Sequence, residues 1–237
     1  MIKLSIVIPV LNEGKNIAKL VEEIKKEKNL LNLSNFELII IDDDSTDNSE
    51  LILNKIKKKN KFFRYYIRKN KKRDLTKSCL LGFDKAVYSN ILVMDGDFQH
   101  PPKYIKYMLN IFTSGNFDIV VGTRNLLKKK DPGLSYIRYV SSLILILTIN
   151  FLLGSKTKDP MSGFFLFKKE IYKKNKKRLY GAGYKILADL IYSSNDRLKV
   201  ADRDIFFDKR KSGKSKMNIK VLFQLIVFIV NKFFKQL

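Results

Sequence analysis

Two aspartates that follow an apolar run have the clearest capacity for chemistry in this chain. Asp95 and Asp97 come directly after residues 91–94, and a single glycine separates them. An apolar run bounded by glycine and proline is typical of a buried strand followed by a turn and a helix with proline in its first turn. The two carboxylates are therefore expected at the carboxyl end of a strand, where open α/β sheets bind their ligands. Oxygen ligands beside phosphate suit Mg²⁺ or Mn²⁺, so phosphate chemistry is the first hypothesis.

Two other groups of aspartates share this spacing, and their positions separate them. Asp42 to Asp44 follow the apolar run 38–41 and therefore also end a strand. Asp202 and Asp204 lie inside an alternating, strand-like stretch with no turn signal after it. Charges on such a strand usually form a solvated face. The aspartates at 95 and 97 and at 42–44 are therefore favoured as functional sites over those at 202 and 204.

The elements that must position these carboxylates alternate along the chain. The alternation predicts βαβ units and a mainly parallel sheet. Ser45 and Asp47 are candidate caps for the helix behind the second strand. Neither the glycine motif of dinucleotide-binding proteins nor a P-loop is present, which argues against a standard dehydrogenase or P-loop enzyme. Strands are expected at 4–9, 36–41, 62–67, 91–94 and 118–121, and helices from about 16, 46, 76 and 101.

Composition limits the class of protein. The 237 residues are enough for one large domain, and no linker-like segment divides them. The single cysteine, Cys79, excludes an internal disulfide and fits a reducing compartment. Without a secretory leader, the amino-terminal part is expected in the cytosol. The formal charge of +24 indicates a polyanionic partner, but the basic residues are dispersed, which disfavours a nucleic-acid-binding protein.

Two apolar stretches in the second half indicate contact with a membrane surface. Residues 143–153 and 219–237 are both shorter in apolar length than the about 20 residues of a membrane span, which favours interfacial helices over spanning ones. Packing against the sheet is the alternative, and it stays open. The basic segment 209–216 precedes the second stretch, and clustered Lys and Arg beside an apolar helix attract anionic lipid. The expected division is a domain over 1–217, with an interfacial helix near 136–154, and a membrane-associating helix over 218–237.

The order and spacing of eight motifs resembles the family 2 glycosyltransferases of the polyprenol-phosphate type. The resemblance runs nearly end to end, and it is the ordered set rather than any one motif that is specific. The motifs are IVIPVLNE (6–13), IDDDSTD (41–47), RDL (73–75), MDGDFQHPP (94–102), VGTR (121–124), DPMSGF (159–164), GYKIL (183–187) and RKSGKSK (210–216).

The resemblance implies a fold and a reaction. The fold is the GT-A-like nucleotide-diphospho-sugar transferase fold, an α/β architecture with a mainly parallel sheet flanked by helices, here with amphipathic interfacial helices. The reaction is inverting transfer of a hexose, with mannose favoured, from GDP-mannose or UDP-glucose to polyprenyl or dolichyl phosphate, assisted by Mg²⁺ or Mn²⁺. Because a lipid phosphate is already an anion at neutral pH, no dedicated general base is required. The expected location is the cytoplasmic side of a membrane, as a peripheral or monotopic protein. A small membrane-anchoring partner is left open.

The resemblance also assigns roles to residues. The nucleotide pocket would be lined by Pro9, Asn12, Glu13, Asp42, Asp43 and Asp95. The metal would be held by Asp95, Asp97 and Gln99. The diphosphate and the lipid phosphate would be bound by Arg124, Ser162, Lys185, Arg210 and Lys216. Direct catalytic roles fall to Asp97, Arg124 and Arg210.

Three positions qualify the resemblance, and one rival function remains. Gly96 stands where relatives often have alanine, which is expected to change little. Asp189 stands where they tend to have glutamate, and its shorter side chain could shift a contact. His100, the only histidine, is expected to be a turn or supporting residue rather than a base. The alternative function is that of a soluble family 2 glycosyltransferase acting on a polysaccharide or protein, which would depend on a general base and have no affinity for lipid.

Overall fold

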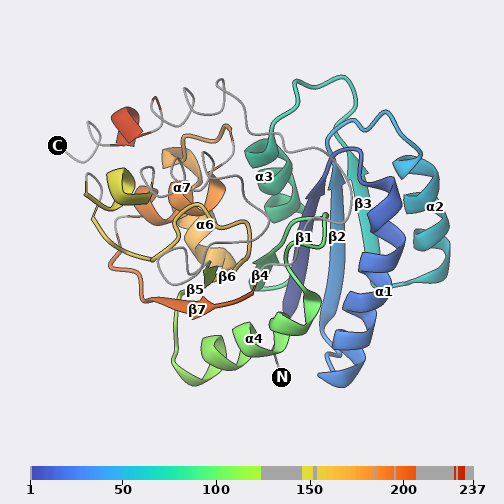
Figure 1. Cartoon of the computed structure of the whole chain (residues 1–237), viewed down its shortest axis with the longest axis horizontal. Coiled ribbons are helices and arrows are strands. Elements are labelled where there is room, and N and C mark those ends of the chain that lie inside the picture. The colour runs from blue at the N-terminus through green and yellow to red at the C-terminus, as the bar shows by residue number, and fades with distance from the viewer. Residues whose placement is uncertain are drawn as a thin grey trace.

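A mixed sheet with helices on both faces forms the body of the protein (Figure 1). The structure is a computed structural model that describes residues 2–123, 146–151, 154–183, 185–194, 196–206, 227 and 229–232. The sheet has seven strands in the order β3-β2-β1-β4-β6-β5-β7. β6 runs antiparallel to both of its neighbours, and the other pairings are parallel. The strands are β1 (Leu4–Val10), β2 (Phe36–Asp42), β3 (Phe63–Ile67), β4 (Asn90–Val93), β5 (Ile119–Thr123), β6 (Phe165–Lys168) and β7 (Val200–Asp204).

The central strands form where the sequence is mostly apolar, and the polar residues Ser5 and Glu37 within them are hydrogen-bonded to each other. Every residue of β1 and β2 is buried, as is every residue of β5. Parallel strands covered by helices on both faces require such mostly apolar runs, whereas a half-exposed sheet would show alternation. The five strands expected from the sequence are confirmed to within a few residues.

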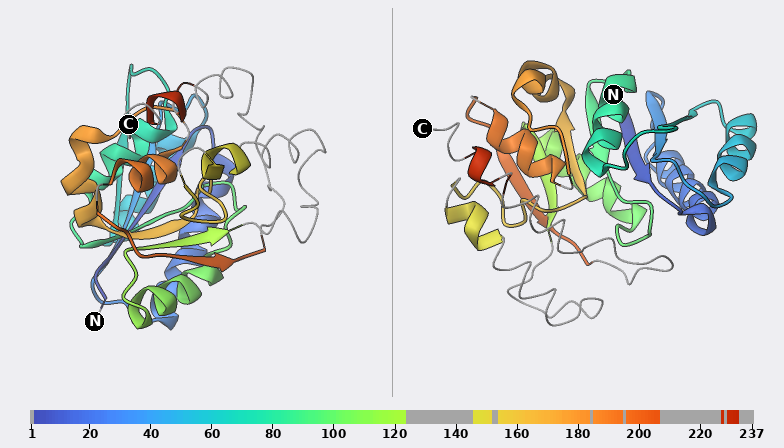
Figure 2. Two further views of the ribbon diagram at one scale, coloured as in Figure 1. Left: turned by 90° about the vertical axis from the view of Figure 1, so that its left-hand side faces the viewer. Right: turned by 90° about the horizontal axis from the view of Figure 1, so that it is seen from above.

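Helices form a layer on each side of the sheet, and Figure 2 shows the layers from two further directions. One apolar core lies between the sheet and α1, α2 and α4, and a second lies between the sheet and α3, α6 and α7. The helices are α1 (Gly14–Leu30), α2 (Ser49–Lys59), α3 (Leu75–Lys85), α4 (Ile105–Ser114), α6 (Lys169–Asn175) and α7 (Ile186–Ser193), with short 3₁₀ helices at Pro102–Tyr104 and Lys176–Arg178. The GT-A-like α/β architecture expected from the sequence is confirmed.

The start of α2 differs from the prediction. The helix begins at Ser49 rather than near residue 46, because the preceding segment is a loop held by side chains. The Asp47 carboxylate accepts hydrogen bonds from the backbone N–H of Ser49 and of Gly14, each at 3.0 Å, and so serves the first residue of two helices. The hydroxyl of Ser45 accepts instead from the N–H of Asn12, at 2.8 Å. Asp47 therefore accepts a hydrogen bond from the start of α2, as predicted, although Asn48 is the residue that directly precedes the helix. The capping role predicted for Ser45 is wrong.

The third aspartate pair lies in β7, and its contacts tie loops together. Asp202 accepts from the hydroxyl of Thr157 and from the N–H of Lys158, the latter at 2.9 Å. Asp204 accepts from the hydroxyl of Thr123 at the end of β5, at 2.9 Å. These contacts agree with the low expectation of a functional role for the pair.

The two apolar stretches each bury one side. In the helical segment 146–151, Ile149 is fully buried in the second core, whereas Leu147 and Phe151 are exposed. In the segment 229–232, Ile229 is buried and Val230 is exposed. No helix within the described part of the chain is both long and apolar enough to cross a bilayer. The remainder of both predicted interfacial helices, and the boundary at 217 and 218, lie outside the described residues.

Candidate active site

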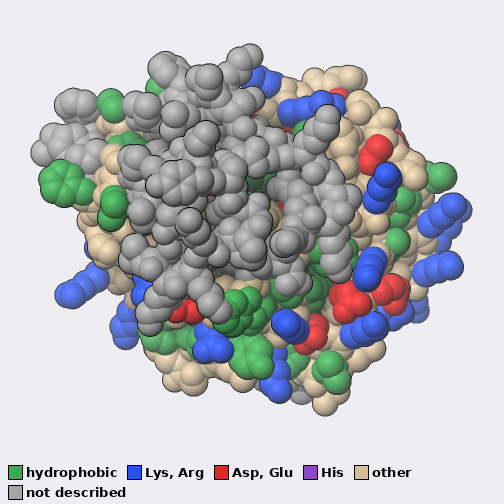
Figure 3. Space-filling view, viewed as in Figure 1, with side chains coloured by type: hydrophobic (Ala, Val, Ile, Leu, Met, Phe, Trp, Pro, Cys, Tyr) green, Lys and Arg blue, Asp and Glu red, His purple; other side chains and the backbone are tan. Residues whose placement is uncertain are grey.

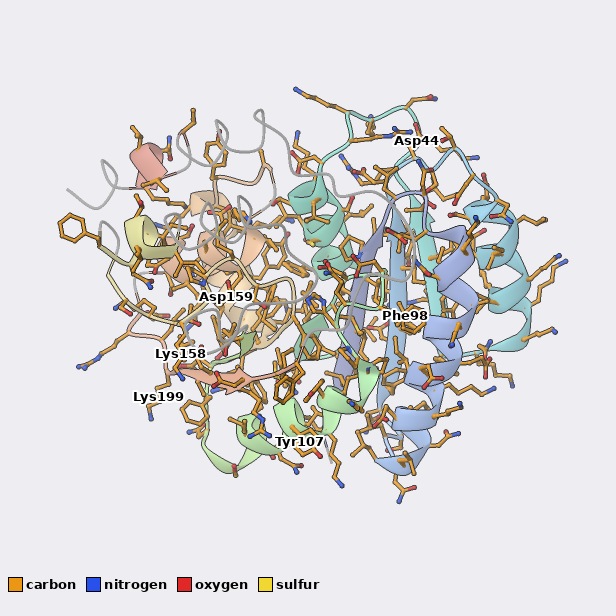
Figure 4. All side chains as sticks on the ribbon, in the orientation of Figure 1. Asp44, Phe98, Tyr107, Lys158, Asp159 and Lys199 are labelled. Atoms are coloured by element: carbon orange, nitrogen blue, oxygen red, sulfur yellow. The ribbon has the colours of Figure 1, made fainter. Side chains whose placement is uncertain are left out.

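The loops that follow β1, β2 and β4 carry most of the candidate residues. The three strands are adjacent and parallel, so their carboxyl ends meet at one edge of the sheet. Figure 4 labels Asp44 and Phe98, which mark the loops after β2 and β4. Pro9 lies near the end of β1, beyond Val7, the last residue that pairs with β4, so its missing N–H costs no hydrogen bond on that side.

The loop after β1 is tied to the loop after β2. Asn12 has a φ of +56°, a conformation in which asparagine is enriched. Its side-chain oxygen accepts from the N–H of Thr46 at 2.8 Å. Glu13 is buried, and its carboxylate accepts from the side-chain amide of Asn16 at 2.6 Å. Glu13 directly precedes α1, and its side chain makes no capping hydrogen bond to a backbone N–H of the helix.

Asp42 presents a carboxylate oxygen with no hydrogen-bond partner among the described residues. The residue is 1% exposed, and its other oxygen accepts from the N–H of Ser45 at 2.7 Å. Burial raises the pKa of Asp42, and the hydrogen bonds from Ser45 oppose that shift only in part. Leaving a buried polar atom unpaired costs about 1–3 kcal/mol, so this oxygen is a candidate acceptor for a ligand N–H or O–H.

Asp43 is already engaged by the protein. Its carboxylate forms a buried ion pair with Arg68 and accepts from the N–H of Asp74 at 2.6 Å. Burial raises the pKa of Asp43, against the lowering by the Asp74 hydrogen bond and by Arg68. Arg68 also donates to the carbonyls of Asp74 and Lys72, at 3.1 and 3.2 Å. Of the two aspartates, Asp42 keeps a carboxylate oxygen without a partner among the described residues, whereas the Asp43 carboxylate is engaged by Arg68 and Asp74.

Arg68 and Asp74 were not among the predicted site residues. The strand register explains the place of Arg68, because Ile67 pairs with Asp42 in the parallel register of β2 and β3. The residue after Ile67 must then lie opposite the residue after Asp42, which places Arg68 beside Asp43. Asp74 belongs to the RDL motif, and its side chain caps α3 by accepting from the N–H of Lys77 at 2.9 Å.

Asp95 and Asp97 lie on the turn after β4, as predicted. The Asp95 side chain is 33% exposed, whereas Asp97 is buried and accepts from the N–H of Gln99 at 3.0 Å. Phe98, between Asp97 and Gln99, has a φ of +66°, which turns the chain back on itself. A Cβ at Gly96 would lie 2.8 Å from Cγ1 of Val10, so alanine would require the Val10 side chain to shift, and the expectation that this position changes little stays a prediction.

The DPMSGF motif supports Asp95 from the other side. A Cβ at Gly163 would lie 2.8 and 2.9 Å from the two Asp95 oxygens, so only glycine leaves room for that carboxylate. The hydroxyl of Ser162 donates to the carbonyl of Gly122 at 2.6 Å and accepts from the N–H of Phe164 at 3.1 Å. The hydroxyl hydrogen of Ser162 is thus directed to the backbone in this structure, and the phosphate contact predicted for Ser162 stays a prediction.

His100 holds the same turn from beneath. Its ring is fully buried and stacks on Phe164, with 5.3 Å between ring centroids and 14° between planes. Its Nδ1 accepts from the N–H of Asp95 at 3.0 Å. These contacts agree with the prediction that His100 supports the site and is not its base.

The oxygen ligands at this turn fit a divalent cation that is completed by substrate. Within the described residues, no three or more His, Cys, Asp or Glu side chains gather as a metal site. Mg²⁺ and Mn²⁺ commonly take one or two protein carboxylates and obtain the rest from phosphates and water. Asp95 and Asp97, with Gln99 beside them, match this number of protein ligands. The absence of a side chain at Gly163 leaves the Asp95 carboxylate in place.

The predicted phosphate-binding residues are only partly placed. Lys185 lies just before α7, where its carbonyl accepts from the N–H of Asp189 at 2.9 Å. Arg124, Arg210 and Lys216 lie outside the described residues. On the face shown in Figure 3, described Lys and Arg side chains are spread around the edges and mixed with Asp and Glu, with no continuous basic stripe of the kind that tracks nucleic acid.

The fold is of the GT-A type. It is similar to the crystal structure of glucosyl-3-phosphoglycerate synthase from Mycobacterium tuberculosis in complex with Mn²⁺, UDP-glucose and phosphoglyceric acid. The TM-score is 0.73 at 16% sequence identity, over 98% of this chain and 79% of that chain. At this identity the likeness concerns the fold.

The chain belongs to glycosyl transferase family 2, whose model matches residues 5–175, and it is a glycosyltransferase. It is 30% identical over 226 residues to a dolichol-phosphate mannosyltransferase of Pyrococcus furiosus. That alignment covers 94% of this chain and 62% of the Pyrococcus protein. It is 29% identical over 233 residues to a dolichol-phosphate mannosyltransferase of Mycosarcoma maydis. That alignment covers 95% of this chain and 77% of the Mycosarcoma protein. The chain thus spans less than two thirds of the Pyrococcus relative.

Proposed function

We propose that this glycosyltransferase moves a hexose, with mannose favoured, from a nucleotide-sugar to polyprenyl or dolichyl phosphate at a membrane surface. The observation that carries the proposal is the convergence of Asp42, Asp95 and Asp97 at one edge of the sheet, where a nucleotide and its diphosphate can be bound together. The names of the relatives that align along almost the whole chain support the choice of acceptor.

The nucleotide is proposed to bind at the loops after β1 and β2. There the unpaired oxygen of Asp42 accepts a hydrogen bond from the base or the ribose. Pro9, Asn12, Glu13 and the Asp43 corner form the surrounding wall. GDP-mannose and UDP-glucose are both candidate donors, because both present N–H and O–H groups to such an acceptor.

The diphosphate is proposed to lie at the turn after β4. Asp95, Asp97 and Gln99 would hold Mg²⁺ or Mn²⁺ there, and the Mycobacterium tuberculosis enzyme was solved with Mn²⁺ and a nucleotide-sugar. When bound, the cation offsets the negative charge that develops on the departing nucleotide. Arg124, Lys185, Arg210 and Lys216 are proposed to contact the phosphates of donor and acceptor, since guanidinium and ammonium groups pair with phosphate oxygens.

The transfer itself needs positioning more than proton removal. An oxygen of the lipid phosphate attacks the anomeric carbon as the bond from that carbon to the nucleoside diphosphate breaks, and the configuration inverts. The attacking phosphate is already an anion, so no proton has to be taken from it. His100 is buried and receives the Asp95 N–H at Nδ1, which agrees with a reaction that uses no histidine base.

The membrane surface is proposed to be met by the two partly buried apolar segments. Leu147 and Phe151 are 58% and 88% exposed, and Val230 is 48% exposed, while neighbours on the same segments are buried. Apolar side chains and a basic segment together are typical of peripheral binding to anionic lipid. The cytoplasmic face is proposed as the location, and a separate anchoring subunit is compatible with it.

The test is transfer of radiolabelled sugar from GDP-mannose, and in parallel from UDP-glucose, into organic-extractable lipid. Polyprenyl phosphate and Mg²⁺ or Mn²⁺ are supplied to the native chain, to Asp97→Ala and to Asp196→Asn, an exposed aspartate distant from the turn after β4 in sequence. Metal-dependent label that is lost only with Asp97→Ala establishes the reaction and identifies the donor. Nucleotide-sugar binding without label in lipid from either donor refutes the acceptor assignment and favours a soluble acceptor, a polysaccharide or a protein.

A further inference from the structure

A buried ion pair joins the carboxyl-terminal segment to α7. The ammonium of Lys232 lies 2.8 Å from the Asp189 carboxylate, and the two side chains are 2% and 3% exposed. Figure 1 shows the segment that contains Lys232 beside α7. Burial of both charges is costly unless they pair with each other and with further hydrogen-bonding groups. The contacts of this pair therefore identify what it holds.

Both members of the pair bind the loop 178–183. The Asp189 carboxylate accepts from the N–H of Tyr180 at 2.9 Å and from the N–H of Gly181 at 2.8 Å. Lys232 donates to the carbonyl of Arg178 at 3.2 Å and also to the hydroxyl of Ser193. The loop is thus fixed at one end by a charge on α7 and a charge on the carboxyl-terminal segment.

The other end of this loop reaches the nucleotide pocket. The N–H of Gly183 donates to the Asp74 carboxylate at 2.8 Å, and the carbonyl of Gly183 accepts from the N–H of Thr76 at 2.9 Å. Gly183 has a φ of +89°, which side-chain-bearing residues rarely adopt. Asp74 in turn donates its own N–H to Asp43 and receives Arg68 at its carbonyl.

We infer that Lys232 and Asp189 are positioning residues for donor binding. They hold the loop 178–183, and Gly183 then holds Asp74 against the corner formed by Asp43 and Arg68. The inference rests on the proposed function, because it takes that corner as part of the nucleotide pocket. Since the segment carrying Lys232 is also proposed to meet lipid, membrane contact and donor affinity are linked through this pair. Such linkage is reciprocal, so nucleotide binding also stabilises the segment.

Docking of the segment does not by itself require the ammonium. Ile229 is buried in the second core, one turn before Lys232, and supplies apolar contact. The ammonium of Lys232 instead contacts the Asp189 carboxylate, which binds the loop, and the carbonyl of Arg178. Replacing it with methionine keeps an unbranched side chain of similar length, removes the charge and its hydrogen bonds, and leaves the Asp189 carboxylate without its buried counterion.

The experiment compares nucleotide affinity in three chains. Dissociation constants for GDP and UDP with Mn²⁺ are measured by calorimetry for the native protein, Lys232→Met and Lys174→Met. Lys174 forms an exposed pair with Asp196 at 3.4 Å and serves as the matched control. Loss of the Lys232 charge is expected to weaken nucleotide binding about tenfold, within the usual range for coupled sites, and to raise KM for the nucleotide-sugar more than it lowers kcat. Lys174→Met is expected to match the native protein.

An unchanged dissociation constant in folded Lys232→Met overturns the inference. If that variant does not fold, hydrogen exchange on the native chain decides. Nucleotide is then expected to slow exchange at the amides of Tyr180, Gly181 and Gly183 and in the segment 229–232, and slowing confined to the loops after β1, β2 and β3 refutes the linkage. A native chain that binds neither nucleotide refutes the proposed function, and the inference with it. A native chain that binds nucleotide but labels no lipid refutes only the acceptor.

Discussion

Replacement of Asp42 by asparagine is predicted to raise stability and weaken nucleotide binding together. The asparagine oxygen can still accept from the N–H of Ser45, while the neutral amide removes the negative charge whose burial raises the pKa of Asp42. The penalty for an unpaired buried group is about 1–3 kcal/mol and is larger for a charged group than for a neutral amide, and in a chain of this size about 1 kcal/mol moves Tm by roughly 2–4 °C. Tm should therefore rise in the absence of ligand.

The same change removes the proposed acceptor for the nucleotide. A hydrogen bond to a charged acceptor is worth about 1.5–3 kcal/mol, so the dissociation constant should increase about 10- to 100-fold. Differential scanning fluorimetry and calorimetric titration with GDP and UDP measure the two effects on one preparation. Asp44→Asn is the control, because Asp44 has a φ of +65°, which asparagine also tolerates.

The pH dependence gives an independent check on Asp42. Burial raises its pKa in the folded chain above the unfolded value, so the folded state binds the proton more tightly. The associated stability is present below the unfolded pKa and is lost as pH rises through the raised folded pKa. Asp42→Asn should remove this part of the pH dependence of Tm. A variant with lower Tm and unchanged nucleotide affinity would refute the role assigned to Asp42.

Three further changes test other parts of the site. Gly163→Ala is expected to reduce metal-dependent transfer at least about 100-fold, because the added Cβ would displace the Asp95 carboxylate, while the circular dichroism spectrum stays native-like. An unchanged kcat/KM would contradict this expectation. Arg68→Met should lower the free energy of unfolding by about 3–5 kcal/mol in urea titrations, because it leaves the Asp43 carboxylate buried and unpaired; a loss below about 1 kcal/mol would show that Asp43 is solvated there. Phe151→Asp should weaken binding to anionic vesicles in sedimentation assays without lowering Tm, since the side chain is 88% exposed. Sedimentation equal to that of the native chain would exclude the segment 146–151 from lipid contact.

The sequence by itself determined the local structure and the edge of the sheet at which the site lies. Continuous apolar runs require strands covered on both faces, and helices between such strands require parallel pairing, so the aspartates after the second and fourth strands had to share one edge. The short antiparallel strand β6 was not predicted. Its four residues give no periodicity that separates a strand from other buried segments.

Only the tertiary structure decided what each polar side chain does. The adjacent Asp42 and Asp43 have the same chemistry in the sequence, yet packing places Arg68 beside Asp43 and gives one oxygen of Asp42 no partner within the described part of the chain. Ser162 is one residue from a glycine that makes room for Asp95, a contact between segments far apart in the chain. Lys232 looks like one more lysine of a basic chain until its partner on α7 is known. Hydrogen bonding and burial depend on neighbours brought together by folding, and local sequence patterns carry no record of them.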